Sequence, residues 1–167
     1  MLKRFFCVIV LVATIVSCAS CTRDKSFTHA DLTLTFDKDF REEKSEDYDL
    51  LVTNGKATAA LSRLSFVDAL RQEISATMSA QEFAEYMLLK TGKSATVFKR
   101  GDYAYYIYRE VMADGEIYSM ATFYRTAYAY VVVLYATSAA RESEYREKFF
   151  EYADSAVMSL DINSNNQ

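Results

Sequence analysis

The residues best suited to covalent chemistry are the cysteines, because a thiolate is a strong nucleophile. The chain has three of them, and Cys18 stands at the end of a characteristic amino-terminal pattern. Lys3 and Arg4 precede the apolar run 5–16, and small residues follow it. That order is typical of a secretory signal peptide. A helix of that length reaches only about 18 Å, against a hydrocarbon core of about 30 Å, which favours a cleaved signal over a spanning anchor.

The four residues at 15–18, "IVSC", resemble the bacterial lipobox, in which the cysteine receives a diacylglycerol and becomes the first residue after cleavage. Two acyl chains hold a protein stably on a bilayer, whereas one chain binds marginally. We therefore expect a signal peptide at residues 1–17 and lipidation of Cys18, which would anchor the protein to the membrane on the extracytoplasmic side of a cell envelope. Two alternatives stay open. Ordinary cleavage near Ser20 would leave Cys21 free or paired, and an uncleaved segment would be an anchor.

The charge balance excludes one class of partner. Residues 1–17 hold two of the 19 basic side chains and none of the 23 acidic ones, so the remaining chain is more acidic than the overall net charge of −4. Nucleic-acid binding needs a basic surface, so we expect no nucleic-acid partner. Attachment to a membrane should come from the acyl chains rather than from charge.

Catalytic and metal-binding patterns are weak. His29 is the single histidine, so neither a serine-histidine-acid triad nor a zinc cluster is indicated. The acidic stretch 37–47 lacks the spacing of a calcium loop and is interpreted as a solvated loop. We expect no catalytic residue, no metal and no cofactor. A carboxylate-dependent hydrolase is the second alternative, since close acids exist, for example Glu82 with Glu85 or Asp114 with Glu116.

The tyrosines are the unusual feature of the composition: there are 13, and no tryptophan. Two interpretations are open, packing within the sheet or an aromatic surface that binds a glycan, a peptide or a protein. On one strand, Tyr106 and Tyr108 share a face while Tyr103 and Tyr105 share the other. The candidate binding surface consists of Tyr103, Tyr105, Tyr106, Tyr108, Tyr118 and Tyr124.

The elements that must position these residues follow from periodicity and turn signals. Asn54-Gly55 and Asp114-Gly115 predict two hairpins. Ser79 and Glu82 form a capping box before a helix that ends at Gly92. A short helix is expected at 66–73 and a long amphipathic one at 139–160, where apolar residues recur at helical spacing. Strands are expected at 31–36, 48–53, 56–65, 95–99, 103–112, 116–125 and 127–137, with a turn at Arg100-Gly101-Asp102.

Because hairpins dominate, the sequence predicts an α+β fold with a largely antiparallel sheet of about six to seven strands and helices packed on it. The chain divides into a lipid-anchored tether at 18–30, a single domain at 31–162 and a flexible tail at 163–167. No cysteine follows Cys21, so the domain must rest on its apolar core.

The order of elements, with the "SAQEFAEY" helix before a meander and a closing helix, resembles the PsbP-like fold, which the Ran-binding Mog proteins share. The opening segment "DLTLTF" and the closing segment "YREKFFEYADSAVMSL" look like those of family members found as bacterial lipoproteins. The resemblance implies an α/β/α sandwich and a group not known for catalysis, and it transfers no site residue. We expect a lipid-anchored, non-catalytic binding or assembly factor in the envelope, with an envelope protein as partner. The first alternative is a receptor for a small ligand or glycan that uses the tyrosine-rich face.

Overall fold

The computed structural model describes residues 24–29 and 31–159, and its largest part is one antiparallel sheet. Seven strands pair in the order β3-β4-β5-β9-β8-β7-β6, which confirms the predicted α+β class and the size of the sheet. The strands are β3 (Arg41–Glu43), β4 (Leu50–Thr53), β5 (Ala57–Ser65), β6 (Phe98–Arg100), β7 (Tyr103–Met112), β8 (Gly115–Arg125) and β9 (Ala129–Ser138). β7 and β8 form the hairpin that Asp114-Gly115 predicted, with the turn itself at Ala113-Asp114, and β9 and β5 follow beside β8 in the sheet.

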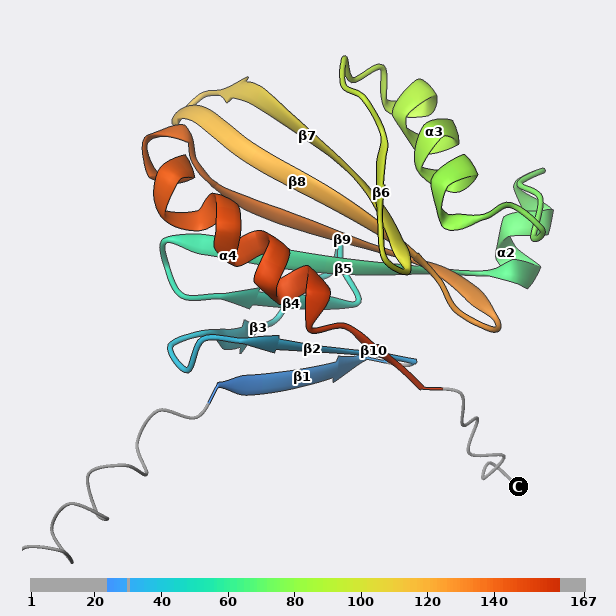
Figure 1. Ribbon diagram of the computed structural model, residues 1–167, viewed down its shortest axis with the longest axis horizontal. Helices are drawn as coiled ribbons and strands as arrows, with labels where there is room; N and C mark the ends of the chain where they lie inside the picture. Colours follow the sequence, from blue (N-terminus) through green and yellow to red (C-terminus); the bar gives the residue numbers. More distant parts are fainter. Residues whose placement is uncertain (1–23, 30, 160–167) are drawn as a thin grey trace, which may run out of the picture.

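A second, three-stranded sheet lies beside the large one (Figure 1). It contains β1 (Lys25–His29), β2 (Leu32–Phe36) and β10 (Val157–Met158), with β2 in the middle. The prediction of a tether over 18–30 is therefore wrong for Lys25–His29. These residues form a strand because Phe27 packs its ring against Phe36, with 5.9 Å between the ring centroids. The remainder of that segment, the predicted signal peptide and the predicted tail lie outside the described residues.

The helices are α2 (Phe66–Arg71), α3 (Ala80–Thr91) and α4 (Glu142–Asp154), with the short 3₁₀ turn η1 (Ala139–Arg141) before α4. The capping box of α3 is confirmed. The Ser79 hydroxyl accepts from the Glu82 amide at 3.2 Å, and a Glu82 carboxylate oxygen accepts from the Ser79 amide at 2.7 Å. Gly92 ends the helix with a φ of 64°, a left-handed conformation that glycine adopts without a Cβ clash. Within the described residues, no helix combines the length and the apolar character needed to cross a bilayer.

α4 ends earlier than the predicted helix 139–160, because Ser155 diverts the chain to β2. Its hydroxyl donates to the Thr35 carbonyl at 3.2 Å and accepts from the Thr35 amide at 2.9 Å. Val157 and Met158 then pair with Thr33 and Leu32 as β10. The predicted helix was too long at its carboxyl end because the spacing of apolar residues continues beyond α4 into β10.

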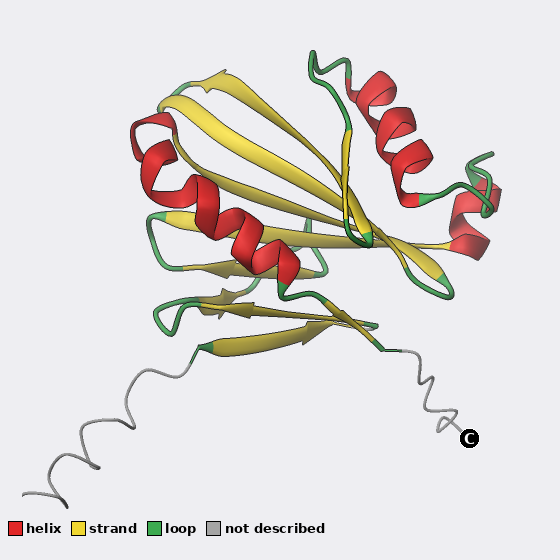
Figure 2. Cartoon of the chain, in the orientation of Figure 1, coloured by secondary structure: helices red, strands yellow, loops and turns green. Residues whose placement is uncertain are grey.

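Helices pack on both faces of the large sheet (Figure 2), and an apolar core lies on each face. α4 and the small sheet cover one face, where Phe36, Tyr135 and Phe149 pack together. α2 and α3 cover the opposite face, where the Phe83 ring stacks on the Tyr130 ring at 4.1 Å. This arrangement confirms the layered sandwich, with the small sheet as an addition that the sequence did not predict. Strands β7, β8 and β9 consequently carry apolar side chains in both directions.

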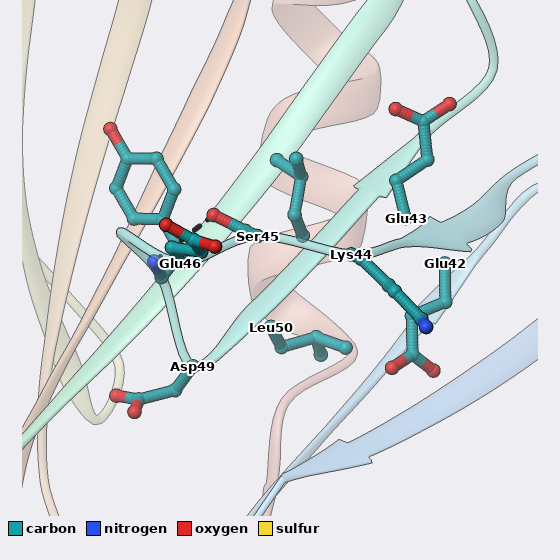
Figure 3. Close-up of a pocket in the computed structure, with 9 residues that line it drawn as sticks. Glu42, Glu43, Lys44, Ser45, Glu46, Asp49 and Leu50 are labelled. Carbon is teal, nitrogen blue, oxygen red and sulfur yellow. Dashed lines mark hydrogen bonds between the residues drawn. The ribbon is translucent and has the colours of Figure 1, made fainter.

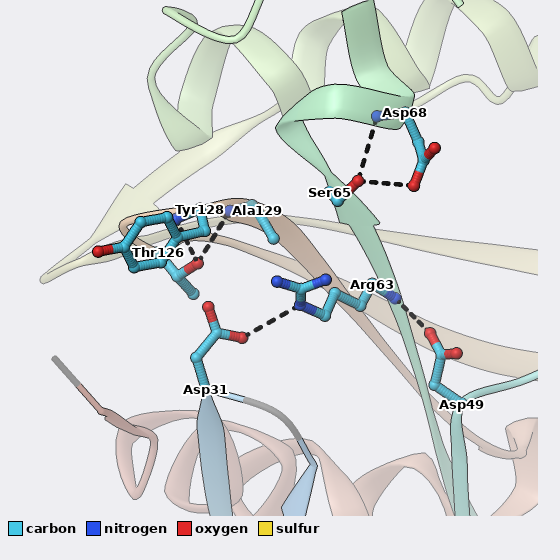
Figure 4. A network of polar contacts seen from close by, with 8 residues as sticks. All are labelled: Asp31, Asp49, Arg63, Ser65, Asp68, Thr126, Tyr128 and Ala129. Carbon is cyan, nitrogen blue, oxygen red and sulfur yellow. Dashed lines mark hydrogen bonds and ion pairs between the residues drawn. The ribbon is translucent and has the colours of Figure 1, made fainter. Parts of the chain in front are cut away.

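Arg63 of β5 connects the two sheets (Figure 4). Its guanidinium donates to Asp31, just before β2, at 3.4 Å, and its amide donates to Asp49 at 2.6 Å. The Asp31 side chain is 16% exposed, and its second carboxylate oxygen is buried without a hydrogen-bond partner in the described part of the chain. The half-buried Asp31 carboxylate therefore depends on Arg63 for its compensating charge.

We predict that Arg63→Ala lowers the free energy of unfolding by about 1–3 kcal/mol, because it leaves a partly buried carboxylate without its cation. Urea denaturation measures the loss. Arg71→Ala is the matched control: its ion pair with Asp68 has side chains 74% and 52% exposed, so the change should stay within about 0.5 kcal/mol. Equal losses in the two variants would contradict the role assigned to Arg63.

Candidate functional site

The six tyrosines of the predicted surface do not form an exposed patch. Tyr118 and Tyr124 are 0% and 1% exposed, and Tyr103 and Tyr106 are 4% exposed. The hypothesis of a surface made by all six is wrong, because helices cover both faces of β7 and β8. The division between faces is confirmed: Tyr103 and Tyr105 contact the core under α4, while Tyr106 and Tyr108 contact the core under α3. The receptor alternative loses its basis with this burial.

Tyr105 and Tyr108 are the two members that stay half-buried. Tyr105 belongs to a group of aromatic rings where β6 meets α4. The Phe98 ring stacks on Tyr105 at 5.5 Å, and the Tyr105 ring meets Phe150 edge to face at 5.1 Å. The Arg100 guanidinium carbon lies 4.7 Å from the centre of the Phe150 ring. Phe98, Arg100, Tyr105 and Phe150 are named here the edge cluster.

Phe98 is 52% exposed although it is a large apolar residue in a strand. Isolated exposed apolar residues are ordinary, but Phe98 stacks on Tyr105, which in turn contacts the Phe150 ring that lies under the Arg100 cation. An aromatic surface beside a guanidinium is suited to contacts with another polypeptide, because aromatic rings and arginine supply much of the binding energy at protein interfaces. The edge cluster is therefore the best candidate for a functional site in the described residues.

Asp154, the last residue of α4, fixes the edge cluster in place. It accepts from Arg100 Nε at 3.0 Å and from the Tyr103 hydroxyl at 2.9 Å. The hydrogen bond from Arg100 lowers the pKa of Asp154, and the bond from Tyr103 adds to this against the opposing effect of burial. The same pairing raises the pKa of Arg100. Arg100 is thus ionised and oriented, and the Arg100-Gly101-Asp102 tripeptide forms the tight turn that the sequence predicted.

Sequence reasoning missed most of this cluster. Tyr105 was among the candidates, but Phe98, Arg100, Phe150 and Asp154 were not. A usable signal did exist in α4, where Glu142, Arg146, Phe150 and Asp154 recur every four residues on one helical face. What the sequence could not show is that this face lies along the outer strands of the sheet.

A hollow with a volume of about 490 Å³ is lined by the loop before β4 (Figure 3). Its acidic side chains, Glu42, Glu43, Glu46 and Asp49, point in different directions rather than toward one centre. In the described residues no three histidine, cysteine or acidic side chains gather closely enough to hold a metal ion. β3 lies at the start of this loop, so the predicted solvated loop 37–47 contains a short edge strand.

The other predicted chemical groups are dispersed. The Glu82 carboxylate caps α3 and Glu85 accepts from Gln81, so the first acid pair is occupied by helix contacts. Asp114 and Glu116 lie at the turn between β7 and β8. His29 lies half-buried on β1, outside any flexible linker. Cys18 and Cys21 lie outside the described residues.

Two smaller hollows lie on opposite sides of the Gly101-Asp102 turn, next to the edge cluster. The one toward α4 has a volume of about 160 Å³ and reaches Asp154 and Met158. The one toward α3 has a volume of about 250 Å³ and reaches Lys99 and Arg125. Both volumes are below those of a typical small-molecule pocket, about 300–1,000 Å³, which fits a contact surface better than an enclosed ligand site.

No family model matches the chain, and no curated protein sequence matches it. Solved structures do share its fold, including the following three. A protein from Bacteroides thetaiotaomicron VPI-5482 is 16% identical with a TM-score of 0.57; the match covers 82% of this chain and 49% of that one, so the chain spans about half its length. Cyanobacterial PsbP from Synechocystis sp. PCC 6803 is 10% identical, with a TM-score of 0.55 over 83% of this chain and 92% of that one.

The Ran-binding protein Mog1p from Saccharomyces cerevisiae is also 10% identical, with a TM-score of 0.54 over 82% of this chain and 96% of that one. These similarities confirm the PsbP-like fold that the order of elements indicated. At such low identities they establish the fold and transfer no residue roles.

We predict that Asp154→Asn makes stability less dependent on acid. Because the folded pKa of Asp154 lies below its ordinary value of 3.8, the ionised carboxylate stabilises the fold above about pH 4, and this contribution disappears as the pH falls through the folded pKa. The variant should be less stable than the wild type at neutral pH and should lose less stability on acidification.

Urea denaturation across a pH series measures both effects. Asp114→Asn makes the same change of charge on an exposed turn and serves as the control. Parallel pH profiles for the wild type and Asp154→Asn would show that the carboxylate does not stabilise the edge cluster in its ionised form.

Proposed function

We propose that this protein is a non-catalytic binding or assembly factor, held on the extracytoplasmic side of a bilayer by a lipid on Cys18, which docks a protein partner through the edge cluster. The observation that carries the proposal is the exposed Phe98 beside Tyr105, Phe150 and an oriented Arg100. Aromatic rings with an adjacent arginine form the kind of compact anchor that protein interfaces favour.

The anchor is supported by the amino-terminal sequence, with its positive residues, apolar run and terminal "IVSC". The described part of the chain begins at Asp24, six residues after Cys18. Six residues span at most about 20 Å, so a lipid on Cys18 would keep the domain close to the bilayer surface. A partner within the same envelope would then meet the domain at a high effective concentration.

A binding role is supported by the absence of a converging catalytic set among the described residues and by the fold. Mog1p, which has the same fold, is a Ran-binding protein. For this chain the partner is proposed to be an envelope protein, because an extracytoplasmic domain meets proteins of that compartment.

We predict that Cys18→Ser releases the protein from membranes while leaving its fold unchanged. Serine lacks the nucleophilic sulfur that accepts the diacylglycerol. Fractionation of cells, with mass spectrometry of the mature amino terminus, measures the result. Cys21→Ser is the matched control and should stay lipidated and membrane-bound. A wild-type protein with an unmodified amino terminus would exclude the lipid anchor.

We predict that a photo-crosslinking amino acid at Phe98 captures an envelope protein in intact cells, because Phe98 is the most exposed ring of the edge cluster. The control is the same amino acid at Leu89, which is 84% exposed on α3, the helix that covers the opposite face of the sheet from α4. Immunoblotting and mass spectrometry identify the products. Equal crosslinking from the two positions, or none from Phe98, would contradict docking at the edge cluster.

A further inference from the structure

The two edges of the large sheet differ in how they are protected. An edge strand presents unpaired backbone groups to solvent, and proteins usually shorten it or give it charges. β3 satisfies both conditions, since its three residues, Arg41 to Glu43, are all charged and exposed. At the opposite edge β6 is also three residues long, but the neighbouring β7 has ten. β6 pairs with β7 only from Tyr103 to Tyr105, so among the described strands none pairs with the outer side of β7 beyond that point.

The backbone groups on this open side follow from the pairing register. Met112 and Gly115 close the two-residue turn between β7 and β8, and such a closing pair exchanges hydrogen bonds. Hydrogen-bonding positions alternate along an antiparallel strand, so even-numbered residues of β7 bond to β8 and odd-numbered ones face outward. The Arg100–Tyr103 pair closes the two-residue turn between β6 and β7. Tyr103 is therefore an odd-numbered residue of β7 that bonds outward to β6, as this alternation requires. The outward N–H and C=O groups without a strand partner belong to Ile107, Arg109 and Val111.

The side chains along this open segment are unusual for an unprotected edge. Val111 is 81% exposed and Met112 is 55% exposed. The two charged residues that precede Val111 on β7, Arg109 and Glu110, already form ion pairs within the chain. Arg109 forms ion pairs with Glu116 and Glu142, and Glu110 pairs with Lys93 at 2.7 Å. A charged incoming segment would have to break one of these pairs, so the edge favours an uncharged one.

We propose that the outer side of β7 from Ile107 to Met112 takes up an extended, uncharged segment of a partner protein as an additional antiparallel strand. The inference rests on the proposed binding function and names the form that the partner adopts. The backbone of the segment bonds to Ile107, Arg109 and Val111. The segment lies beside β7 beyond the point where the chain's own residues 93–97 lead into β6. Its side chains on the α4 side lie next to Ile107, which packs against the same core as Tyr105 of the edge cluster.

Lys93 is the group that an incoming strand displaces. It reaches Glu110 from the segment before β6, and its ammonium lies 4.5 Å from the centre of the Tyr108 ring. A lysine placed across an edge strand is a common protection against unwanted pairing. Lys93 is a single flexible side chain, so it can move without disturbing the β7–β8 ladder.

A second copy of this chain is a less suitable occupant. When β7 of two copies pairs antiparallel through the outward groups, the register with the greatest overlap is centred on Arg109. It places Arg109 opposite Arg109 of the second copy. The nearest register that keeps the outward groups facing each other is a slide of two residues, which places Glu110 opposite Glu110. Like charges directly opposite each other destabilise a sheet.

The test uses the full chain in detergent micelles, panned against a random twelve-residue peptide library displayed on phage. We expect uncharged peptides in which apolar residues alternate with small or polar ones. Hydrogen exchange of the wild-type protein with a selected peptide should slow at the amides of Ile107, Arg109 and Val111. The amides of Tyr108 and Glu110, which bond to β8, serve as internal references and should change little.

Val111→Pro removes one outward N–H group that forms no hydrogen bond with β8. We expect this substitution to lower the affinity for the selected peptide by about tenfold. Val111→Ala keeps the N–H and should change the affinity by no more than about twofold. Circular dichroism melting checks the fold of both variants, and the exchange experiment on the wild type stands without them.

Peptides that bind Val111→Pro as tightly as the wild type, or that protect another region, would overturn the inference and leave docking at the edge cluster standing. A library that yields no peptide would overturn it as well. A wild-type dimer that Val111→Pro dissociates would identify a second copy as the occupant instead. The proposed function fails separately, when Phe98 captures no envelope protein and the amino terminus carries no lipid.

Discussion

The structure depends on one requirement, that both faces of a wide antiparallel sheet be shielded from water. The middle strands β7, β8 and β9 carry large apolar side chains in both directions, so neither face can remain in solvent. α3 and α2 shield one face, while α4 shares the other with the small sheet. Tyrosine suits this task, since its ring fills the core and its hydroxyl can reach a polar group at the margin, as Tyr124 does with the Ala153 carbonyl at 3.1 Å.

The shielding is complete in the middle and ends at the margin, which is where the candidate site lies. α4 runs over the sheet toward its outer strands and ends at Asp154, which orders Arg100 and Tyr103. The aromatic rings beyond that point remain half-covered because no further element packs on them within the described chain. At the same margin, one side of β7 lacks a neighbouring strand beyond Tyr105. The exposed rings and the unpaired backbone groups of β7 therefore have one cause, the shortness of β6.

Local signals predicted most of the elements. The capping box of α3, both glycine turns and the strand at 103–112 were read from a few residues each, because caps and tight turns depend on local chemistry. The early end of α4 was missed because it depends on contacts with β2, more than a hundred residues from Ser155. Strand β1 was missed because Phe27 is its one apolar residue, which leaves no alternation to recognise. The tyrosines were named correctly by face, yet periodicity alone cannot tell a strand covered on both sides from one with an exposed aromatic face. The edge cluster needed the spatial order of the strands.

The position of β2 between the first and the last strand has a consequence for biosynthesis. Val157 pairs with Thr33, so a ladder near the beginning of the domain is completed by residues near the end of the described chain. Contacts between such distant positions form late, because the intervening loop must first be ordered. A chain that emerges from its amino terminus therefore cannot finish the small sheet until Val157 and Met158 have been released. Until then one side of β2 lacks its neighbouring strand, and the nascent chain depends on β10 to complete the small sheet.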